Sequence, residues 1–213
     1  MRAYKFLSSG GVGLFSGFAW PQPVDDAPGA WVVASGPLEL GANGLHACTA
    51  SQLPYWINDE LWTLELDDEL LEEERVVVAR RARLLHRVET WAYEAAVAFG
   101  EVCAWRARDR ACAILRERGL EQAAAELEAC DDLGELVLVG EAVAGAAPDR
   151  SGLVAGYAAD VADYTGRAAA EEGSSAAWAG CAAYVSAIAA GEEASAAERG
   201  WQSAWLVERL GLA

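Results

Sequence analysis

The chain contains a single lysine, Lys5, and only two histidines, His46 and His86. A P-loop needs a lysine directly behind a glycine-rich turn, and Lys5 has no such turn before it, so P-loop nucleotide chemistry is excluded. The H-E-x-x-H, G-x-S-x-G and Cys-x-x-Cys motifs are also absent, and with two histidines the usual zinc sites are nearly excluded. We therefore expect no metal and no cofactor.

Signals for disulfides and for membranes are missing as well. The five cysteines are odd in number, and most lie in alanine-rich sequence, where a free cysteine behaves as a small apolar residue. No apolar run is long and hydrophobic enough for a signal-peptide core or a membrane span, including the alanine-rich stretch Ser174–Ala190. These features predict a reduced, cytoplasmic protein.

Negative charge dominates the composition, with 33 acidic residues against 16 basic ones and a net charge of −17. Such a field repels phosphate backbones and anionic lipid headgroups, so we expect neither nucleic acid nor a membrane as a partner. A hydrophobic fraction of 54% is enough for a sizeable core. All basic residues except Lys5 are arginines, which with the abundant Ala, Gly and Val is typical of a GC-rich, actinobacterial-type genome.

Up to about Arg83, short apolar runs separated by turn residues predict strands. In the clearest run, Leu61–Leu66, apolar and polar residues alternate between two faces. The segment Ala50–Trp56 fits either a short helix or an irregular loop. The five expected strands are Arg2–Leu7, Trp31–Ala34, Leu45–Cys48, Leu61–Leu66 and Arg75–Arg81.

After Leu84 the apolar residues recur at steps of three and four, which predicts a long amphipathic helix from Leu84 to about Arg118. The segment Asp131–Ala147 is ambiguous between strand and helix, and Pro148 is expected to break it. Further helices, several of them ended by a glycine, are expected at Leu120–Ala129, Ser151–Glu172, Ala176–Ala190 and Glu192–Leu210.

Together these patterns predict an α+β fold. A small mixed or antiparallel sheet formed by residues 1–83 would pack on an alanine-rich bundle of four to six helices formed by residues 84–213. Because no flexible linker separates the two regions, we expect one compact unit with a ligand pocket where they meet.

The glycine run Gly10–Gly17 follows a predicted strand, as a dinucleotide-binding loop would. The segment behind it, Phe18–Pro23, contains two prolines and cannot open the helix that such a loop requires. We interpret the run as a flexible turn.

Two charged clusters lie next to each other in the sequence. The acidic run Asp59–Glu74 is compatible with calcium or magnesium ligation, but it lacks the EF-hand order, and a solvated hairpin loop between two strands is the simpler interpretation. The basic cluster Arg80–Arg87 is compatible with a phosphate or carboxylate site, or with balancing the acidic run before it.

His46 is the main candidate for chemistry. On a strand, His46 and Cys48 face the same way but lie roughly 7 Å apart, too far for a Cys–His nucleophile pair. His46 alone, among several tryptophans, suits a general acid or base in an aromatic pocket, or equally a histidine satisfied by a loop carbonyl. The expected substrate-binding residues around it are Cys48, Tyr55, Trp56 and Trp62, with Arg81 or Arg83 holding an anionic group.

The functional hypothesis is therefore a cofactor-independent enzyme of bacterial specialised metabolism that acts on a small molecule, as a cyclase, lyase or group transferase. The first alternative is a non-catalytic interaction module in which the tryptophans and the acidic face contact a partner. The chain could also form a homodimer.

The segments Tyr4–Phe6, Gly44–Cys48 and Leu53–Trp56 resemble a family of uncharacterised bacterial and phage domains that share a Gly-Leu/Phe-His-Ala-Cys core, over residues 1–85. The order of these elements is also similar, more distantly, to ADP-ribosyltransferase-like folds, which would imply nucleotide binding. Lys5 stands where the first motif of those folds has a histidine or arginine, and their terminal catalytic glutamate has no clear match.

Overall fold

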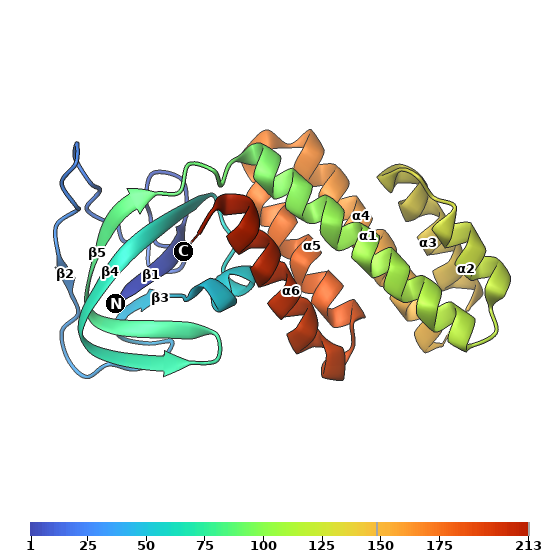
Figure 1. Ribbon diagram of the computed structural model, residues 1–213, viewed down its shortest axis with the longest axis horizontal. Helices are drawn as coiled ribbons and strands as arrows, with labels where there is room; N and C mark the ends of the chain where they lie inside the picture. The colour runs from blue at the N-terminus through green and yellow to red at the C-terminus, as the bar shows by residue number, and fades with distance from the viewer. Residues whose placement is uncertain (148, 213) are drawn as a thin grey trace. The chain divides into compact units, whose positions relative to one another are not determined.

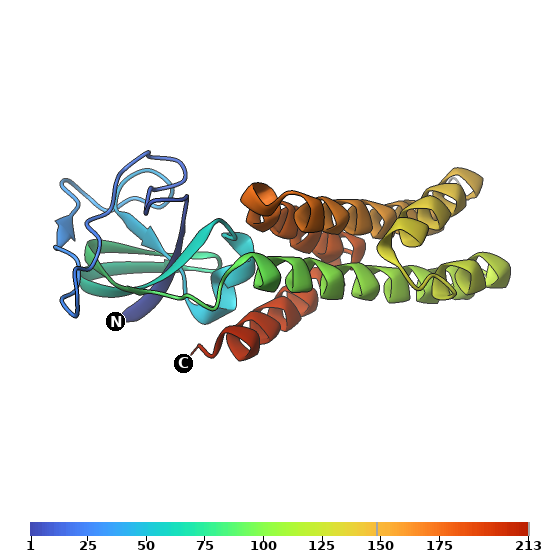
Figure 2. The ribbon, with the colours of Figure 1, turned by 90° about the horizontal axis from the view of Figure 1, so that it is seen from above.

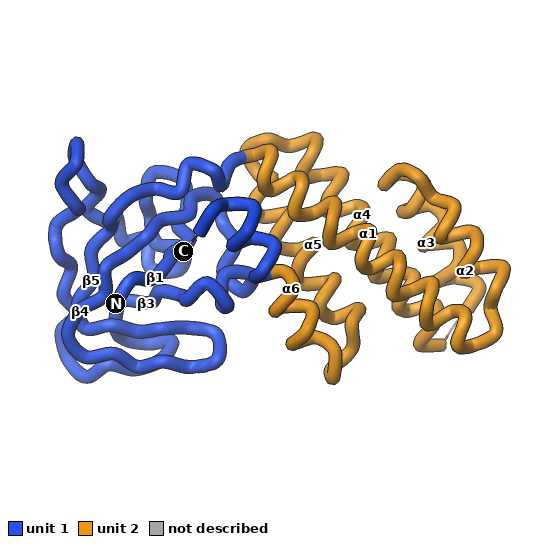
Figure 3. The backbone as a smooth tube through the Cα atoms, viewed as in Figure 1, with its two compact units in different colours: residues 1–92, 203–213 blue, residues 93–202 orange. Residues whose placement is uncertain are grey.

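The computed structural model describes residues 1–147 and 149–212, so the break expected at Pro148 lies outside the described residues. The described strands all precede the α-helices in the chain (Figure 1), which confirms the predicted α+β class. The chain divides into two compact units (Figure 3), which we call the sheet unit, residues 1–92 with the C-terminal segment from Ser203, and the helical unit, residues 93–202.

The sheet unit is built from antiparallel strand pairs with the order β1-β4-β5-β2, and β3 pairs with β5 as well. A 3-10 helix, Ala50–Tyr55, follows β3, which resolves the ambiguity of that segment. The strands are β1 (Arg2–Leu7), β2 (Val32–Val33), β3 (Leu45–Ala47), β4 (Glu60–Glu73) and β5 (Val76–Arg87).

The sheet closes on itself through the residue that follows β3. Tyr4 of β1 and Cys48 exchange two backbone hydrogen bonds of 2.8 Å, so β1, β4, β5 and β3 form a ring. Two irregularities in the register of β4, at Thr63/Leu64 and between Asp67 and Leu70, bend this strand, as β-bulges do in small barrels.

The core of the sheet unit lies inside this ring. Because side chains alternate along a strand, Ala3 and Leu7 of β1 face the same interior as Trp62 and Leu64 of β4, and all four are buried. On the opposite face of β1, Phe6 packs edge-on against Trp91, with ring centroids 5.5 Å apart.

The C-terminal segment belongs to the sheet unit through two hydrogen bonds. The Ser203 hydroxyl donates to the carbonyl of Ala50 at 2.6 Å, and the Thr90 hydroxyl donates to the carbonyl of Leu210 at 3.1 Å.

The helical unit packs α1, α4 and α5 against one another and α3 against α4, and α1 runs along its length (Figure 2). Small residues let these helices approach closely: a side chain on Gly140 of α3 would lie 3.0 Å from the Ala155 carbonyl of α4. The helices are α1 (Tyr93–Glu117), α2 (Glu121–Glu128), α3 (Leu133–Ala146), α4 (Arg150–Ala170), a 3-10 turn (Glu172–Ser174), α5 (Ser175–Ala189) and α6 (Glu192–Leu210), the last of which continues into the sheet unit.

Two sequence predictions are wrong. The helix expected from Leu84 begins only at Tyr93, because Leu84 is a buried strand residue that pairs with Leu64. The acidic run is not a loop: β4 extends through it to Glu73, where charged residues on its exposed face meet arginines of β5. The ambiguous segment 131–147 forms α3, whose first turn is capped by the Asp132 side chain.

Candidate functional site

His46 lies half-buried on β3, opposite Val78, and both of its ring nitrogens contact backbone. Nδ1 lies 3.1 Å from the carbonyl oxygen of Gly44, and Nε2 accepts the backbone N–H of Gly41 at 3.1 Å. These partners fit a neutral ring that donates from Nδ1. Burial lowers the pKa of His46, despite the opposing effect of the Gly44 hydrogen bond, and the nearby Lys5 lowers it further. The imidazole thus ties the loop before β3 to the strand.

Cys48 and Trp62 are both buried, with exposed fractions of 1% and 6%. Burial raises the pKa of the Cys48 thiol to about 12, so the thiol stays protonated and lacks the reactivity of a thiolate. The indole of Trp62 donates to the carboxylate of Glu60 at 3.0 Å. These two side chains complete the core and the closure of the ring.

Tyr55 and Trp56 contact the turn between β4 and β5. The indole of Trp56 donates to the carbonyl of Arg75 at 2.6 Å, and the Arg75 guanidinium lies 5.2 Å from the centroid of the Tyr55 ring. The aromatic pair therefore holds the end of the hairpin, a structural task that the sequence alone does not reveal.

Arg81 and Arg83 form cross-strand ion pairs with β4. Arg81 lies 3.4 Å from Asp67 and Arg83 lies 2.6 Å from Glu65, and both guanidinium groups lie within 4.5 Å of the centroid of the Trp31 ring. The same pattern continues along the hairpin with Arg80–Glu69 at 2.6 Å and Arg87–Glu60 at 3.4 Å. This geometry favours the interpretation that the basic cluster balances the acidic strand.

The seven residues predicted from the sequence thus have structural partners of their own. His46 and Cys48 are brought together with Lys5 where the ring closes, whereas Tyr55 and Trp56 contact the hairpin turn. The hypothesis that His46 acts as a general acid or base stays a prediction.

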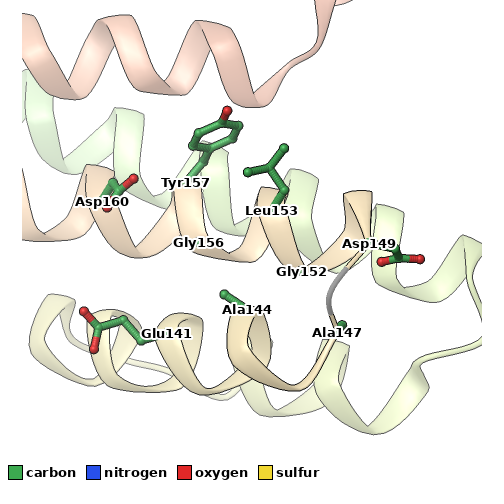
Figure 4. Close-up of a pocket in the computed structure, with 9 residues that line it drawn as sticks. All are labelled: Glu141, Ala144, Ala147, Asp149, Gly152, Leu153, Gly156, Tyr157 and Asp160. Carbon is green, nitrogen blue, oxygen red and sulfur yellow. The ribbon is translucent and has the colours of Figure 1, made fainter.

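A groove between α3 and α4 of the helical unit is a further candidate site (Figure 4). Its volume is about 440 Å³. Gly152 must be a glycine, because a Cβ atom would lie 1.6 Å from the carbonyl oxygen of Ala147. The groove is lined by Glu141, Ala144, Ala147, Asp149, Gly152, Leu153, Gly156, Tyr157 and Asp160.

The charged residues of this groove are all acidic. Asp149 lies at one end, and Glu141 of α3 and Asp160 of α4 lie toward the other, each on its own helix (Figure 4). Burial, together with repulsion from Asp163 and Glu141, raises the pKa of the Asp160 carboxyl. Asp163 has a partner, Arg167, at 2.8 Å. Within the described residues, Glu141 and Asp160 have no ion pair and no side-chain hydrogen bond, so their charges are unneutralised.

The helical unit also contains a buried charge network around Glu198, whose side chain is fully buried. Arg106 and Arg110, one turn apart on α1, each donate to Glu198 at 2.7 Å. The Ser186 hydroxyl adds a bond of 3.0 Å. Burial by itself would raise the pKa of Glu198, but the hydrogen bonds and charges of the two arginines outweigh it and lower the pKa. This network joins α1, α5 and α6.

An exposed trio of carboxylates, Asp131, Asp132 and Glu135, places its oxygens within 4.8 Å of one another. Asp132 accepts the backbone N–H of Glu135 at 2.8 Å, and Glu135 accepts the backbone N–H of Asp131 at 3.3 Å. This is the reciprocal pattern of a helix cap, and capping accounts for the arrangement.

Sequence reasoning missed the groove because the segment that forms α3 was ambiguous. One signal was present: Gly152, Gly156 and Asp160 recur at steps of four, which places two glycines and a carboxylate on one helix face. Arg106 and Arg110 are also four residues apart, which places both on one face of α1, where they donate to Glu198.

Within the described residues, no helix is both long enough and apolar enough to cross a lipid bilayer. The resemblances to the Gly-Leu/Phe-His-Ala-Cys family and to ADP-ribosyltransferase-like folds stay predictions. A comparison of the chain with protein-family models, curated proteins and solved structures finds no match.

Proposed function

We propose that this chain is a non-catalytic binding protein whose helical unit holds a cationic, amphipathic segment of a partner protein in the groove between α3 and α4. One observation carries the proposal: the charged residues that line the groove are all acidic, and two of them, Glu141 of α3 and Asp160 of α4, form no ion pair among the described residues. Burial, and then repulsion from Asp163 and Glu141, raises the pKa of Asp160, and a cation placed beside its carboxylate offsets that repulsion, so cation binding is favoured.

The apolar part of the groove supports a peptide occupant. Ala144, Gly152 and Gly156 leave the floor nearly free of side chains, and Leu153, with an exposed fraction of 54%, offers an aliphatic contact. Leu153, Tyr157 and Asp160 project from one side of α4 (Figure 4). Small-molecule sites usually enclose most of their ligand, whereas an open groove between two helices suits a segment laid along it.

The spacing of the carboxylates indicates the pattern of the partner. Asp149 caps the start of α4 and Asp160 lies near the middle of this helix, about 16 Å further along at the rise of an α-helix. A helical partner segment would match them with basic residues about eleven positions apart and small apolar residues between. Arginine fits best, because its planar guanidinium pairs with a carboxylate through two hydrogen bonds.

The test uses two synthetic helical peptides of about 15 residues, identical except that one carries arginine and the other glutamate at the two spaced positions. We expect the arginine peptide to bind, with an affinity that falls as salt rises from about 0.05 M to about 0.3 M, and the glutamate peptide not to bind. Isothermal titration calorimetry measures both. Equal binding of the two peptides, or no binding of either, would contradict the proposal.

Two pairs of variants locate the binding to the groove. Glu141→Gln with Asp160→Asn should weaken the arginine peptide about tenfold. Glu101→Gln with Glu117→Gln removes the same charge from exposed positions of α1 and should not.

The second pair tests the groove floor. Gly156→Leu fills the floor and should abolish binding, whereas Gly166→Leu on the same helix, where a Cβ meets nothing within 4 Å, should leave it unchanged.

A further inference from the structure

The exposed face of α5 is apolar from end to end. This helix contains no charged side chain over its 15 residues, Ser175–Ala189, whereas every other α-helix of the described residues carries charged side chains. A helix that is apolar on all sides is normally covered on all sides. Here one stripe of the helix stays open to solvent, and it consists of Ala177, Cys181, Tyr184 and Ile188.

The spacing of the stripe is typical of a helix that packs against another helix. The four residues follow one another at steps of four, three and four positions, as in the seam of a coiled coil. The exposed fractions of Tyr184 and Ile188 are 59% and 38%. The Arg199 guanidinium of α6 lies 5.9 Å from the centroid of the Tyr184 ring, but Arg199 is only 8% exposed and adds little charge to the open side. In a chain with a net charge of −17, a second copy can therefore approach this stripe without meeting carboxylates of α5.

The stripe is complementary to itself when two copies run antiparallel. Its small residues, Ala177 and Cys181, lie in the N-terminal half of α5, and its large ones, Tyr184 and Ile188, lie in the C-terminal half. A two-fold axis between positions 181 and 184 places Ala177 opposite Ile188 of the second copy, and Cys181 opposite its Tyr184. Each large side chain then meets a small one, as close packing requires. A parallel pair would set large residues against large ones and leave gaps between the small ones.

We propose that this face of α5 is a self-association surface, on which a second copy of the chain packs its own α5 in antiparallel orientation. The surface shares no residue with the groove between α3 and α4, so the two are independent sites. Removal of apolar area from water drives the association, and the net charge of −17 on each copy opposes it. Because a single pair of helices buries a small area, the dimer should be reversible, with a dissociation constant in the micromolar range.

Sedimentation of the full chain under reducing conditions, from about 1 µM to about 200 µM, measures the association. We expect a monomer–dimer equilibrium that tightens as salt rises from about 0.05 M to about 0.3 M, because salt screens the repulsion between the two acidic copies. This dependence is opposite to the one expected for the arginine peptide. A chain that remains monomeric over this range, or a dimer that weakens with salt, would overturn the proposal.

Charge placed on the stripe should separate the copies. Tyr184→Glu and Ile188→Glu each put a carboxylate at an exposed position, where folding tolerates it, and should weaken the dimer at least about tenfold. Leu138→Glu on α3, where the parent side chain is 70% exposed, places the same charge on another helix and should leave the dimer unchanged. Circular dichroism verifies that each variant keeps its helices. A dimer that survives both substitutions on α5, or that Leu138→Glu weakens equally, would contradict the proposal.

Cross-linking tests the antiparallel orientation. Two chains are prepared with Cys181→Ser, one with Ala177→Cys and the other with Ile188→Cys, and the remaining cysteines are all buried. Mild oxidation of the mixture should form a disulfide between positions 177 and 188, because the two-fold axis sets them opposite each other. Each chain alone should cross-link poorly, since the two copies of one position would lie about 16 Å apart along the helix axis. Cross-links within the separate chains but not in the mixture would indicate a parallel pair and overturn this orientation.

Discussion

The β4–β5 hairpin of the sheet unit and the α3–α4 groove of the helical unit both gather charged side chains, but only the hairpin pairs them. On the hairpin, Arg81 and Arg83 face Asp67 and Glu65 across the strands. In the groove, the three charged residues are all acidic and two of them have no partner among the described residues. A dense run of charge in the sequence is therefore not by itself the sign of a site.

For buried charges the contrast between the two units is reversed: the helical unit pairs Glu198, whereas Lys5 of the sheet unit forms no ion pair among the described residues. In the helical unit, Glu198 is held by Arg106 and Arg110. In the sheet unit, Lys5 has a backbone carbonyl and an aromatic ring as neighbours. Since a buried charge is most stable when it is paired and hydrogen-bonded, the surroundings of Glu198 favour a structural role, and those of Lys5 lower the pKa of its amine.

The largest effect is expected at Glu198. Glu198→Ala leaves the guanidinium groups of Arg106 and Arg110 without their shared carboxylate, which should lower the free energy of unfolding by about 3–5 kcal/mol. Urea unfolding followed by circular dichroism measures this change. Glu101→Ala, at an exposed position of α1, should change it by less than about 0.5 kcal/mol.

An equally small effect at both positions would mean that the buried network does not hold the helices together. The comparison between paired and unpaired charges would then lose its strongest example.

A smaller effect is expected at His46. His46→Ala removes two hydrogen bonds to the loop before β3 and should cost about 1–2 kcal/mol of unfolding free energy. His86→Ala is the control, because His86 lies exposed near the end of β5.

The same histidine gives the stability of the protein a dependence on pH. Because the folded pKa of His46 is lowered, the unfolded chain binds more protons below pH 6.5, the ordinary value. The contribution of His46 is present above that pH and is lost as the pH falls through the folded pKa. The difference in unfolding free energy between parent and His46→Ala should therefore shrink on acidification. A difference that is constant from about pH 4.5 to about pH 8 would contradict the neutral ring described above.

The catalytic hypothesis for His46 can be separated from its structural task by comparing function with stability. If the His46→Ala variant still folded but no longer bound a small ligand that the parent binds, His46 would have a functional role. If the variant lost only loop stability, the histidine is structural.

Much of the fold could be predicted from the sequence, since hydrophobic periodicity and glycine stops mark most elements. The helix expected at 192–210 matches α6, and the strand at 2–7 matches β1. The error at Leu84 arose because Leu84, Val88 and Trp91 happen to follow a helical spacing although tertiary contacts place them in a strand and a turn. Local pattern could not decide this, because the partner of Leu84 is Leu64, twenty residues away in the sequence.

The site was harder to predict than the fold. That His46 is distinctive is visible in the sequence, but its partners Gly41 and Gly44 are backbone atoms, which leave no signature of side-chain type. The unpaired state of Glu141 and Asp160 depends on which helices become neighbours. Such information exists only in three dimensions.

The smallest effects test the difference between the groove and the hairpin most sharply, because removing a carboxylate should change the stability of the protein in opposite directions at the two places. Asp160→Asn removes a carboxylate whose raised pKa reflects burial and repulsion, so at neutral pH the variant should be more stable than the parent. Glu65→Gln removes a carboxylate that pairs with Arg83, so this variant should be less stable. Asp160 is an exposed residue and the Glu65 side chain is 40% exposed, so solvent screens both carboxylates in part and each change should amount to only about 0.2–1 kcal/mol.

The sign of the Asp160 effect can be checked against pH. A raised folded pKa means that the folded chain binds more protons than the unfolded chain in the acidic range. The advantage of Asp160→Asn should therefore be largest at neutral pH and should vanish as the pH falls below the folded pKa, when Asp160 itself is protonated. Thermal unfolding of the parent and the two variants at about pH 4 and about pH 7 shows whether each substitution raises or lowers the stability. If both variants lost stability at neutral pH, Asp160 would have a stabilising partner in the folded protein. That result would contradict the proposal that the groove binds a cationic ligand.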